Sequence, residues 1–294
     1  MLFLIFLNIL YASTFTLSKI LLKYGQPVFL TAARMLLSGA TLLLFHYIIA
    51  KKDFKNVRLK KKDLWPLLQI IFFGNFISYV FEFIALKDMP SLKVAFLYNL
   101  TPFVMAIISY IYLKEKISLK KWLGLIISIV GCIPILIEQS PSEELVSGLL
   151  FISWSELILI AGIVAYAYSW QTMRKLIHYE DQSPIIVNYL TMIGGGLIAL
   201  PLGWYFEGIF PVNNVMELAF WLTIMIIVSN IVFYYFYGSL LKKYSATFIS
   251  LTTLSCPIIT AFFGVLFLGE KITYAFIFAN VLVFAGLYLY YTEE

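Results

Sequence analysis

Apolar runs long enough to cross a lipid bilayer occupy nearly the whole of this chain. A helix needs about 20 mainly apolar residues to cross a hydrocarbon core about 30 Å thick. With Pro, Gly and charge clusters taken as boundaries, ten runs meet this length. They cover approximately residues 2–22, 28–50, 64–86, 91–113, 119–137, 150–173, 183–203, 217–241, 245–268 and 273–292. The sequence therefore predicts an all-α integral membrane protein with ten transmembrane helices.

The composition excludes the main soluble classes. Of 294 residues, 62% are apolar and 13% are charged, whereas about a quarter of a soluble domain is charged. The net charge of +5 comes from residues between apolar runs, so we expect no nucleic-acid partner. Cys132 and Cys256 lie in apolar stretches and lack the spacing of a metal site or a disulfide framework. We expect neither a metal nor another cofactor.

The distribution of Lys and Arg predicts the orientation. If the N-terminus is cytoplasmic, the inner loops carry fifteen basic residues and the outer side carries five. The positive-inside rule then places both termini in the cytoplasm, in a multi-pass protein of the inner (plasma) membrane. The first run is kept as a span because residues 1–4 lack the basic start of a signal peptide, and Ala12 and Ser13 form a weak cleavage site.

The chain matches itself at an offset of 155 residues. Residues 115–118 (Glu-Lys-Ile-Ser) align with 270–273 (Glu-Lys-Ile-Thr). The same offset aligns the following pairs: Asn75 with Asn230, Tyr79 with Tyr234, Pro102 with Pro257, and Gly131 with Gly286. The sequence therefore predicts two repeats, residues 1–140 with spans one to five and residues 141–294 with spans six to ten.

Each predicted repeat holds an odd number of spans, so the second enters the membrane from the opposite side. Inverted repeats can exchange conformations around a site near the midplane, which is the physical basis of alternating access. Transport is thus the leading function on the sequence pattern alone.

These residues resemble the EamA-type branch of the drug/metabolite transporter superfamily. The likeness rests on paired prolines, Pro102 and Pro257, in spans four and nine, and on the Glu-Lys motifs before spans five and ten. Arg34 also resembles a basic position common in that branch. The resemblance implies that spans one to four and six to nine surround a central cavity, with spans five and ten outside. The substrates it implies include amino acids, cationic or aromatic metabolites, S-adenosylmethionine, nucleotide sugars and drugs.

A polar stripe marks span three. Asn75, Ser78, Tyr79 and Glu82 are spaced i, i+3, i+4 and i+7, which puts them on one helical face. A carboxylate within a span costs several kcal/mol unless it meets water or a partner, so Glu82 is the leading functional group. The alternative is that Glu82 extends to the headgroups at the outer end.

Opposite charges are predicted at one depth near the outer end. Arg34 lies about six residues, or about 9 Å, inside span two. We expect Arg34 to pair with Glu82, and Lys19 to pair with Glu156. Either pair could form an outer gate or a static contact that orients helices.

Further candidates lie around the two prolines and the two mid-span asparagines. A proline frees the carbonyl four residues earlier, here those of Tyr98 and Thr253, and can form a hinge. Asn75 and Asn230 fit either substrate contacts or interhelical hydrogen bonds. The substrate-binding or gating set is Lys19, Arg34, Asn75, Tyr79, Glu82, Tyr98, Asn99, Pro102, Glu156, Asn230, Tyr234, Thr253 and Pro257.

Several features are predicted to be structural or to line the cavity. Ser118 and Thr273 are placed as N-caps, Glu115 and Glu270 as structural turns, and residues 194–196 as a close helix approach. The aromatic residues that could line a cavity for cationic or ring-bearing solutes are Tyr11, Tyr98, Tyr166, Tyr168, Trp170, Tyr234 and Tyr235.

The leading interpretation is a secondary transporter that moves an amino acid or related small metabolite across the inner membrane, by export or exchange. The alternative is a transporter of S-adenosylmethionine or another nucleoside-type solute. A membrane enzyme or a structural subunit is the alternative of another class, and we expect no enzyme because no catalytic set lies at one depth. No ATP-binding motif occurs, so coupling is to a proton carried by Glu82, to a counter-solute, or absent. The predicted partners are a small-molecule solute and the lipid bilayer.

Overall fold

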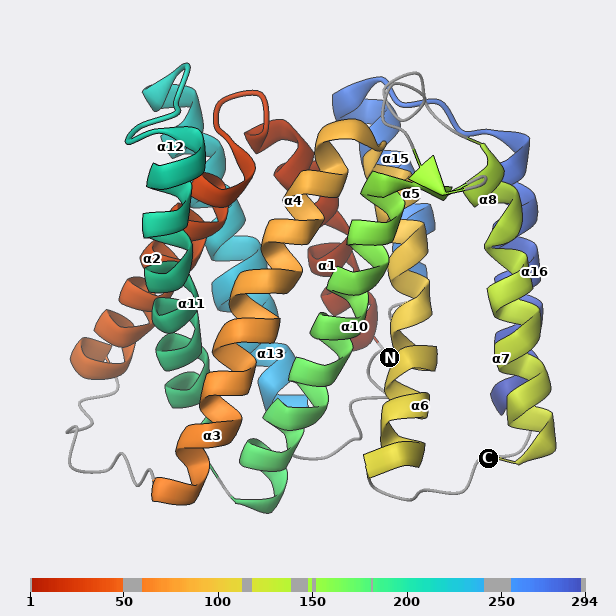
Figure 1. Ribbon diagram of the computed structural model, residues 1–294, viewed down its shortest axis with the longest axis horizontal. Coiled ribbons are helices and arrows are strands. Elements are labelled where there is room, and N and C mark those ends of the chain that lie inside the picture. Colours follow the sequence, from red (N-terminus) through yellow and green to blue (C-terminus); the bar gives the residue numbers. More distant parts are fainter. Residues whose placement is uncertain are drawn as a thin grey trace.

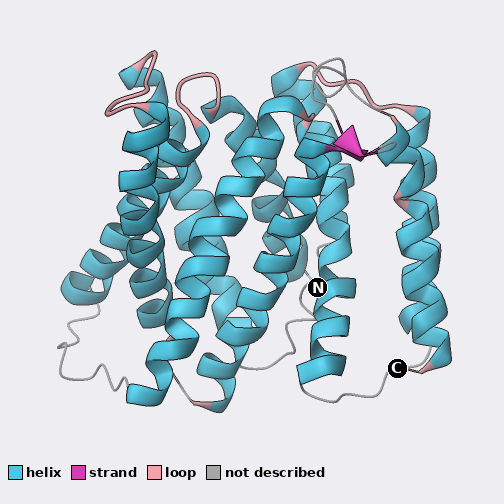
Figure 2. Ribbon diagram, viewed as in Figure 1, coloured by secondary structure: helices cyan, strands magenta, loops and turns pink. Residues whose placement is uncertain are grey.

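The computed structural model describes residues 2–49, 60–112, 118–138, 148–149, 152–180, 182–240 and 255–291. These residues are predominantly helical (Figure 2), which confirms the predicted all-helical class. A short antiparallel ladder pairs β1 (Gly148–Leu149) with β2 (Ile152–Ser153). The apolar pattern did not predict this ladder, because two residues per strand leave no periodic signal.

The helices follow one another in the order of the predicted spans. In the first half they are α1 (Leu2–Leu21), α2 (Pro27–Leu44) with the π-helical turn η1 (Phe45–Ile49), α3 (Lys61–Gln69), the π-helical turn η3 (Ile70–Ile77), α4 (Ser78–Asp88), α5 (Ser91–Leu97), the 3₁₀ turn η4 (Tyr98–Leu100), α6 (Thr101–Tyr112), α7 (Leu119–Gly131) and α8 (Ile133–Ile137).

In the second half they are α10 (Trp154–Arg174) with the π-helical turn η5 (Lys175–Tyr179), α11 (Pro184–Glu207), α12 (Val215–Met225), the π-helical turn η6 (Ile226–Val232), α13 (Phe233–Leu240), α15 (Cys256–Leu268) and α16 (Tyr274–Tyr291).

Six of the described helical runs are long and apolar enough to cross a membrane by length and composition. They are Pro27–Ile48, Lys61–Asp88, Ser91–Ile111, Leu119–Ile137, Pro184–Glu207 and Val215–Tyr237. Shorter apolar helices cover Phe6–Leu21, Cys256–Leu268 and Tyr274–Gly286. The molecule is thus a multi-pass membrane protein, while the count of ten spans and their division into two repeats stay predictions.

The helices stand roughly side by side (Figure 1). The most extensive contacts join α2 to α11 and α7 to α16, followed by α4 with α10 and α1 with α15. Helices α7 and α16 lie together at one edge of the molecule, where the resemblance placed spans five and ten. We call the end with the turns 22–26, 208–214 and 269–273 the upper end, and the end where α3 begins the lower end.

Glycines allow the tightest helix contacts. A Cβ atom at Gly195 of α11 would lie 2.8 Å from the Asn75 carbonyl oxygen, and one at Gly196 would lie 2.9 Å from the Leu36 nitrogen. Both distances are shorter than real side chains tolerate. The predicted close approach at residues 194–196 is therefore confirmed.

The predicted N-caps are also confirmed. The Ser118 hydroxyl accepts a hydrogen bond from the Lys121 amide at 3.2 Å, and the Thr273 hydroxyl accepts one from Phe276 at 3.2 Å. Both caps satisfy amides that a helix start otherwise leaves without a partner. Glu115 lies outside the described residues.

Candidate functional site

A buried arginine lies at the centre of the bundle. Arg34 of α2 is only 1% exposed, and its Nε donates to Oδ1 of Asn230 at 2.8 Å. The guanidinium lies over the Tyr79 ring, 4.4 Å from the ring centroid, in cation–π geometry. The Tyr79 hydroxyl makes a short hydrogen bond with the Tyr234 hydroxyl. Four predicted site residues from four helical segments are thus in contact.

A buried carboxylate lies on the same helix as Tyr79. Glu82 is 3% exposed, so it does not extend to the headgroups. Its oxygens accept hydrogen bonds from Tyr98 at 3.0 Å and from Ser18 at 3.3 Å. The predicted Arg34–Glu82 ion pair is wrong as a direct contact: no such pair is found among the described residues. The hydroxyl groups of Ser18 and Tyr98 stabilise the Glu82 carboxylate. The Asn230 amide and the Tyr79 ring stabilise the Arg34 guanidinium.

Aromatic rings surround these two charged groups. Tyr11 of α1 stacks on Phe233 with centroids 5.2 Å apart, and Tyr98 meets Tyr166 edge-on at 5.5 Å. The ring centroids of Trp170 and Tyr237 are 3.9 Å apart. The rings in this central cluster are Tyr11, Phe15, Tyr79, Tyr98, Tyr166, Trp170, Phe233, Tyr234 and Tyr237. Buried, closely packed aromatic faces favour ring-bearing and cationic solutes.

Two of the predicted aromatic residues lie elsewhere. Tyr168 of α10 packs against Phe73 and accepts a hydrogen bond from Gln69, outside the central cluster. Tyr235 is 46% exposed. Each is one or two positions from a cluster residue, and a shift of one residue turns a helical side chain by about 100°. Phe15, Phe233 and Tyr237 were not singled out by the sequence, because an aromatic residue in a span is equally compatible with lipid contact.

Several buried polar atoms at this centre have no hydrogen-bond partner within the described part of the protein. They are Arg34 Nη1, Asn75 Oδ1, Asn99 Nδ2 and Asn230 Nδ2. Buried polar atoms are nearly always paired, and leaving one without a partner costs about 1–3 kcal/mol. Only Asn230 among these amides is bonded to Arg34, and atoms without a partner also occur elsewhere in the described bundle, for example Thr16 Oγ1 and Asn280 Oδ1.

Irregular helical turns position these side chains. Asn75 lies in η3 and Asn230 in η6, two π-helical turns that lie 155 residues apart along the chain. Such turns widen a helix locally and are frequent at functional sites. Tyr98 and Asn99 lie in the 3₁₀ turn before Pro102, where the predicted freed carbonyl of Tyr98 accepts from the Thr101 amide.

The other candidates from the second proline are only partly described. Pro257 lies in the first turn of α15, where proline is tolerated because its missing amide proton would have no helical partner. Thr253 lies outside the described residues.

The predicted Lys19–Glu156 pair is wrong. Lys19 Nζ donates to the backbone oxygens of Leu86 and, at 2.9 Å, of Met89, where it caps the end of α4. Glu156 instead pairs with Lys93 of α5, with 2.8 Å between Nζ and Oε1. Both charged side chains are at most 3% exposed. Lys93 was counted among the five basic residues of the outer side. Its place inside the predicted span 91–113 was a usable signal that it is buried.

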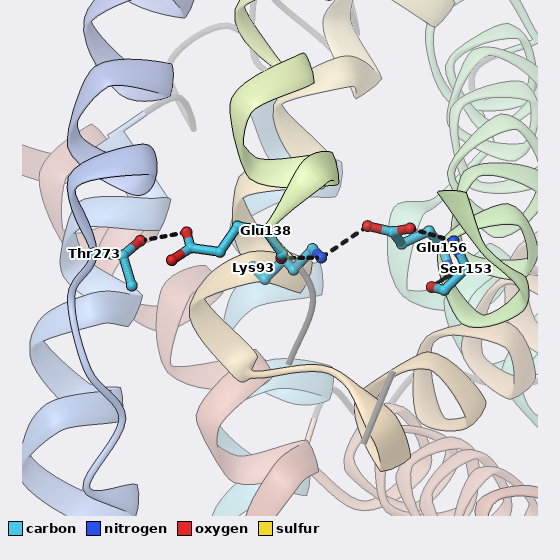
Figure 3. Close-up of polar contacts among 5 residues, drawn as sticks. All are labelled: Lys93, Glu138, Ser153, Glu156 and Thr273. Atoms are coloured by element: carbon cyan, nitrogen blue, oxygen red, sulfur yellow. Dashed lines mark hydrogen bonds and ion pairs between the residues drawn. The ribbon is translucent and has the colours of Figure 1, made fainter. Parts of the chain in front are cut away.

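This ion pair belongs to a polar network at the upper end (Figure 3). Lys93 Nζ also donates to the Glu138 backbone oxygen at 2.9 Å, and the Glu138 carboxylate accepts from Thr273 at 2.6 Å. Glu156 accepts from the Ser153 amide at 2.6 Å and so completes a capping box. The network connects α5, α8, α10 and the start of α16.

Two more carboxylates cap helices across the molecule. Glu270 accepts from the Ser91 amide at 2.6 Å, at the start of α5, and Glu207 accepts from Val28 at 2.9 Å and Phe29 at 2.8 Å, at the start of α2. A negative charge at a helix N-terminus is favourable. The structural role predicted for Glu270 therefore includes a contact between the two halves of the chain.

Comparison with known proteins gives the family. The chain matches the EamA-like transporter family over residues 1–137 and 153–292. This protein belongs to the EamA-like transporter family. The resemblance drawn from the sequence is therefore confirmed, and with it the membrane and transporter character of the chain.

The relatives with curated names are transporters. An S-adenosylmethionine/S-adenosylhomocysteine transporter of Chlamydia trachomatis is 32% identical over 99% of this chain and 89% of its own length. The transporter of the same name from Chlamydia muridarum is 31% identical over 99% of this chain and 92% of its own length. The uncharacterized transporter YvbV of Bacillus subtilis is 24% identical over the full chain and 92% of its own length.

The fold is also known from experiment. A crystal structure superposes with a TM-score of 0.71 and covers 99% of this chain and 97% of its own, at 16% sequence identity. At that identity the likeness concerns the fold alone.

Metal chemistry finds no support in the described residues. No group of three His, Cys, Asp or Glu side chains is placed to hold a metal ion among them. The arrangement at the centre is instead suited to binding: one cation, one carboxylate, several amides and a wall of aromatic rings.

Proposed function

We propose that this protein is a secondary transporter for S-adenosylmethionine, S-adenosylhomocysteine or a closely related nucleoside-bearing amino acid. The observation that carries the proposal is buried Arg34, whose Nη1 has no hydrogen-bond partner, in an aromatic cluster that also holds Glu82. The amino acid export predicted first remains unconfirmed. The curated relatives named above support the nucleoside-type alternative better.

The two charges fit the amino acid end of such a solute. A guanidinium binds a carboxylate by two parallel hydrogen bonds, and Nη1 of Arg34 has no hydrogen-bond partner in the described protein. The Glu82 carboxylate can accept from an α-ammonium group in exchange for the hydroxyls of Tyr98 and Ser18. One cation and one anion thus match the zwitterionic end, so the site is neutral overall with S-adenosylhomocysteine, and the sulfonium of S-adenosylmethionine adds one positive charge.

The rings and amides fit the nucleoside end. Tyr11, Tyr98 and Tyr166 offer faces on which a purine can stack and over which a sulfonium cation is attracted. Asn75 Oδ1 is an acceptor and Asn99 Nδ2 a donor, and a purine carries an amino group and ring nitrogens that complement them.

The proposed mechanism is alternating access by two inverted repeats, residues 1–140 and 141–294. Support comes from matched contacts at the 155-residue offset: α4 packs on α10 as α13 packs on α1, and α6 packs on α10 as α15 packs on α1. Tyr79 and Tyr234, whose hydroxyl groups are hydrogen-bonded to each other, are separated by the 155-residue offset of the predicted repeat. Exchange of S-adenosylmethionine for S-adenosylhomocysteine would need no other coupling, and a proton carried by Glu82 is the alternative.

The test is solute exchange in proteoliposomes. Vesicles loaded with unlabelled S-adenosylhomocysteine should accumulate labelled S-adenosylmethionine, and the recovered label should be chemically unchanged, as expected of a transporter and not an enzyme. Adenosine and methionine alone should compete weakly, because each occupies half of the site. Accumulation of methionine with no uptake of S-adenosylmethionine would contradict this proposal and favour amino acid transport.

A substitution at the centre makes the test specific. Arg34→Lys keeps the charge but removes the planar fork, so we expect exchange to fall at least tenfold while the protein folds normally. Thr41→Ser is the matched control, since Thr41 lies on the same helix but is exposed and donates its hydrogen bond to the Leu37 carbonyl of that helix. Equal exchange by the wild type and Arg34→Lys would show that Arg34 does not bind the solute.

A further inference from the structure

A groove lies on the face of α10 that points away from the central cluster. Tyr168, Gln171, Thr172 and Lys175 recur at i, i+3, i+4 and i+7 and are only partly buried or exposed. Tyr166, Trp170 and Met173 cover the opposite side and are buried in the central cluster and core. Helix α10 therefore presents aromatic and apolar side chains to the interior and a polar stripe to the outside.

The groove has a volume of about 420 Å³ and is formed by α3, α6 and α10. In Figure 1, α10 lies between α3 and α6 toward the lower end. Its walls are tied by hydrogen bonds from Gln69 to the Tyr168 hydroxyl at 2.7 Å and from Gln171 to Ser109 at 2.8 Å. The residues that line it are Trp65, Pro66, Gln69, Ile108, Ser109, Tyr168, Gln171, Thr172, Arg174 and Lys175.

The groove has the charge of an anion site. Arg174 and Lys175 stand at its lower mouth, and none of the lining residues is acidic. The Glu180 carboxylate, which follows nearby in the chain, is paired with Lys62. Trp65 beside the mouth is 68% exposed, as is usual for an indole at the membrane interface.

The amide and hydroxyl groups of this stripe bond to α3 and α6, as Tyr168 does to Gln69 and Gln171 to Ser109, and they form a polar wall that suits the headgroup region of a membrane better than its hydrocarbon core. The stripe runs seven residues, about 10 Å, from Lys175 inward to Tyr168. This depth matches a phospholipid headgroup and its glycerol esters, while Ile108 and Pro66 offer apolar contact to the start of the acyl chains.

We propose that this groove binds the headgroup of an anionic phospholipid from the leaflet at the lower end. The phosphate contacts Arg174 and Lys175, and an ester oxygen accepts from the second amide proton of Gln69, because both amide protons of Gln171 are donated to Met105 and Ser109. The site is separate from the solute site because it occupies the other face of α10. Anionic lipid bound there holds α3, α6 and α10 together, so it stabilises the folded transporter.

The test is lipid retention by the full-length protein in detergent, measured by native mass spectrometry with phosphatidylglycerol or phosphatidylcholine. We expect the wild type to retain phosphatidylglycerol preferentially, and Arg174→Gln/Lys175→Gln to bind it about 10- to 30-fold more weakly, at about 1 kcal/mol for each charge. Lys120→Gln/Lys121→Gln, basic residues of α7 outside the groove, is the matched control and should keep the preference.

Further arms separate the possible sources of the signal. Soluble glycerol phosphate should not displace the lipid at millimolar concentration, because it lacks acyl chains; displacement would point to a free phosphate ligand and overturn the proposal. Displacement by S-adenosylmethionine would show a solute site and overturn it too. If the double variant folds poorly, exposed Lys175→Gln alone should still weaken retention. Equal retention of both lipids by the wild type would also contradict the proposal.

Discussion

At the scale of single residues, the centre of this protein is held by buried charges with incomplete hydrogen bonding. Arg34 and Glu82 are each stabilised by neutral groups, and several amide atoms beside them have no partner in the described structure. A static structural role would favour complete pairing, because each open atom costs free energy. Atoms without a partner also occur elsewhere in the described bundle, such as Thr16 Oγ1 and Asn280 Oδ1, so the proposed site rests on the charges and rings together with these atoms.

Glu82→Gln separates exchange from proton coupling. The substitution keeps the shape and one acceptor oxygen, turns the other oxygen into a donor NH2 group and removes the charge, so we expect exchange of a cationic or zwitterionic solute to fall at least tenfold. Uptake should be measured across a range of pH with and without an imposed gradient. Glu180→Gln, in the surface pair with Lys62, is the control. Normal transport by Glu82→Gln at every pH would exclude Glu82 as a proton carrier.

At the scale of helices, contacts across the two halves of the chain hold the upper end together. Lys93 joins α5 to α10, Glu270 caps α5, and Glu207 caps α2. None of these contacts could be read from helical periodicity, because each joins residues that are distant in sequence.

The buried Lys93–Glu156 pair should couple strongly in a double-mutant cycle. Lys93→Met or Glu156→Gln alone should lower the free energy of unfolding by about 3–5 kcal/mol, and the double variant should lose less than the sum. Unfolding can be followed with a thiol-reactive dye, because Cys132 and Cys256 are buried. The exposed Lys62–Glu180 pair should show no measurable coupling. Additive losses for Lys93 and Glu156 would mean that the ion pair is energetically unimportant.

Gly195→Ala should weaken the contact between α11 and η3. The new methyl group would lie 2.7 Å from the Asn75 Cβ and 2.8 Å from its carbonyl oxygen, so the helices must move apart, at a cost of about 1–3 kcal/mol. Gly203→Ala on the same helix is the control, since its nearest atom would be 3.3 Å away. The midpoint of thermal unfolding, read by the same dye, measures the difference. Equal midpoints would show that α11 is not tightly packed at Gly195.

At the scale of the whole molecule, the proposal requires two halves of opposite orientation and therefore both termini on one side of the membrane. A fluorescent protein that folds only in the cytoplasm should be bright when fused to either end of the chain. A reporter active only outside should be inactive at both ends. Termini on opposite sides would rule out ten spans and the inverted repeat together.

The sequence by itself determined the membrane environment, the helical class and the family, and it singled out the groups for which we propose a function. Runs of apolar residues state which segments lie in lipid, and a charged residue within such a run has an energetic cost that marks it as functional. Arg34 and Glu82 were identified in this way, and the structure buries both: Arg34 contacts Tyr79 and Asn230, whereas Glu82 bonds to Tyr98 and Ser18.

Only the tertiary structure decided which of these groups touch. Glu82 is bonded to Tyr98 and Ser18, and Glu156 to Lys93, in place of the partners that equal depth predicted. Depth in the membrane follows from position along one helix, but contact depends on the rotation of each helix and on its neighbours. Those are set by packing between distant segments, such as the glycine contacts of α11, which no single helix encodes.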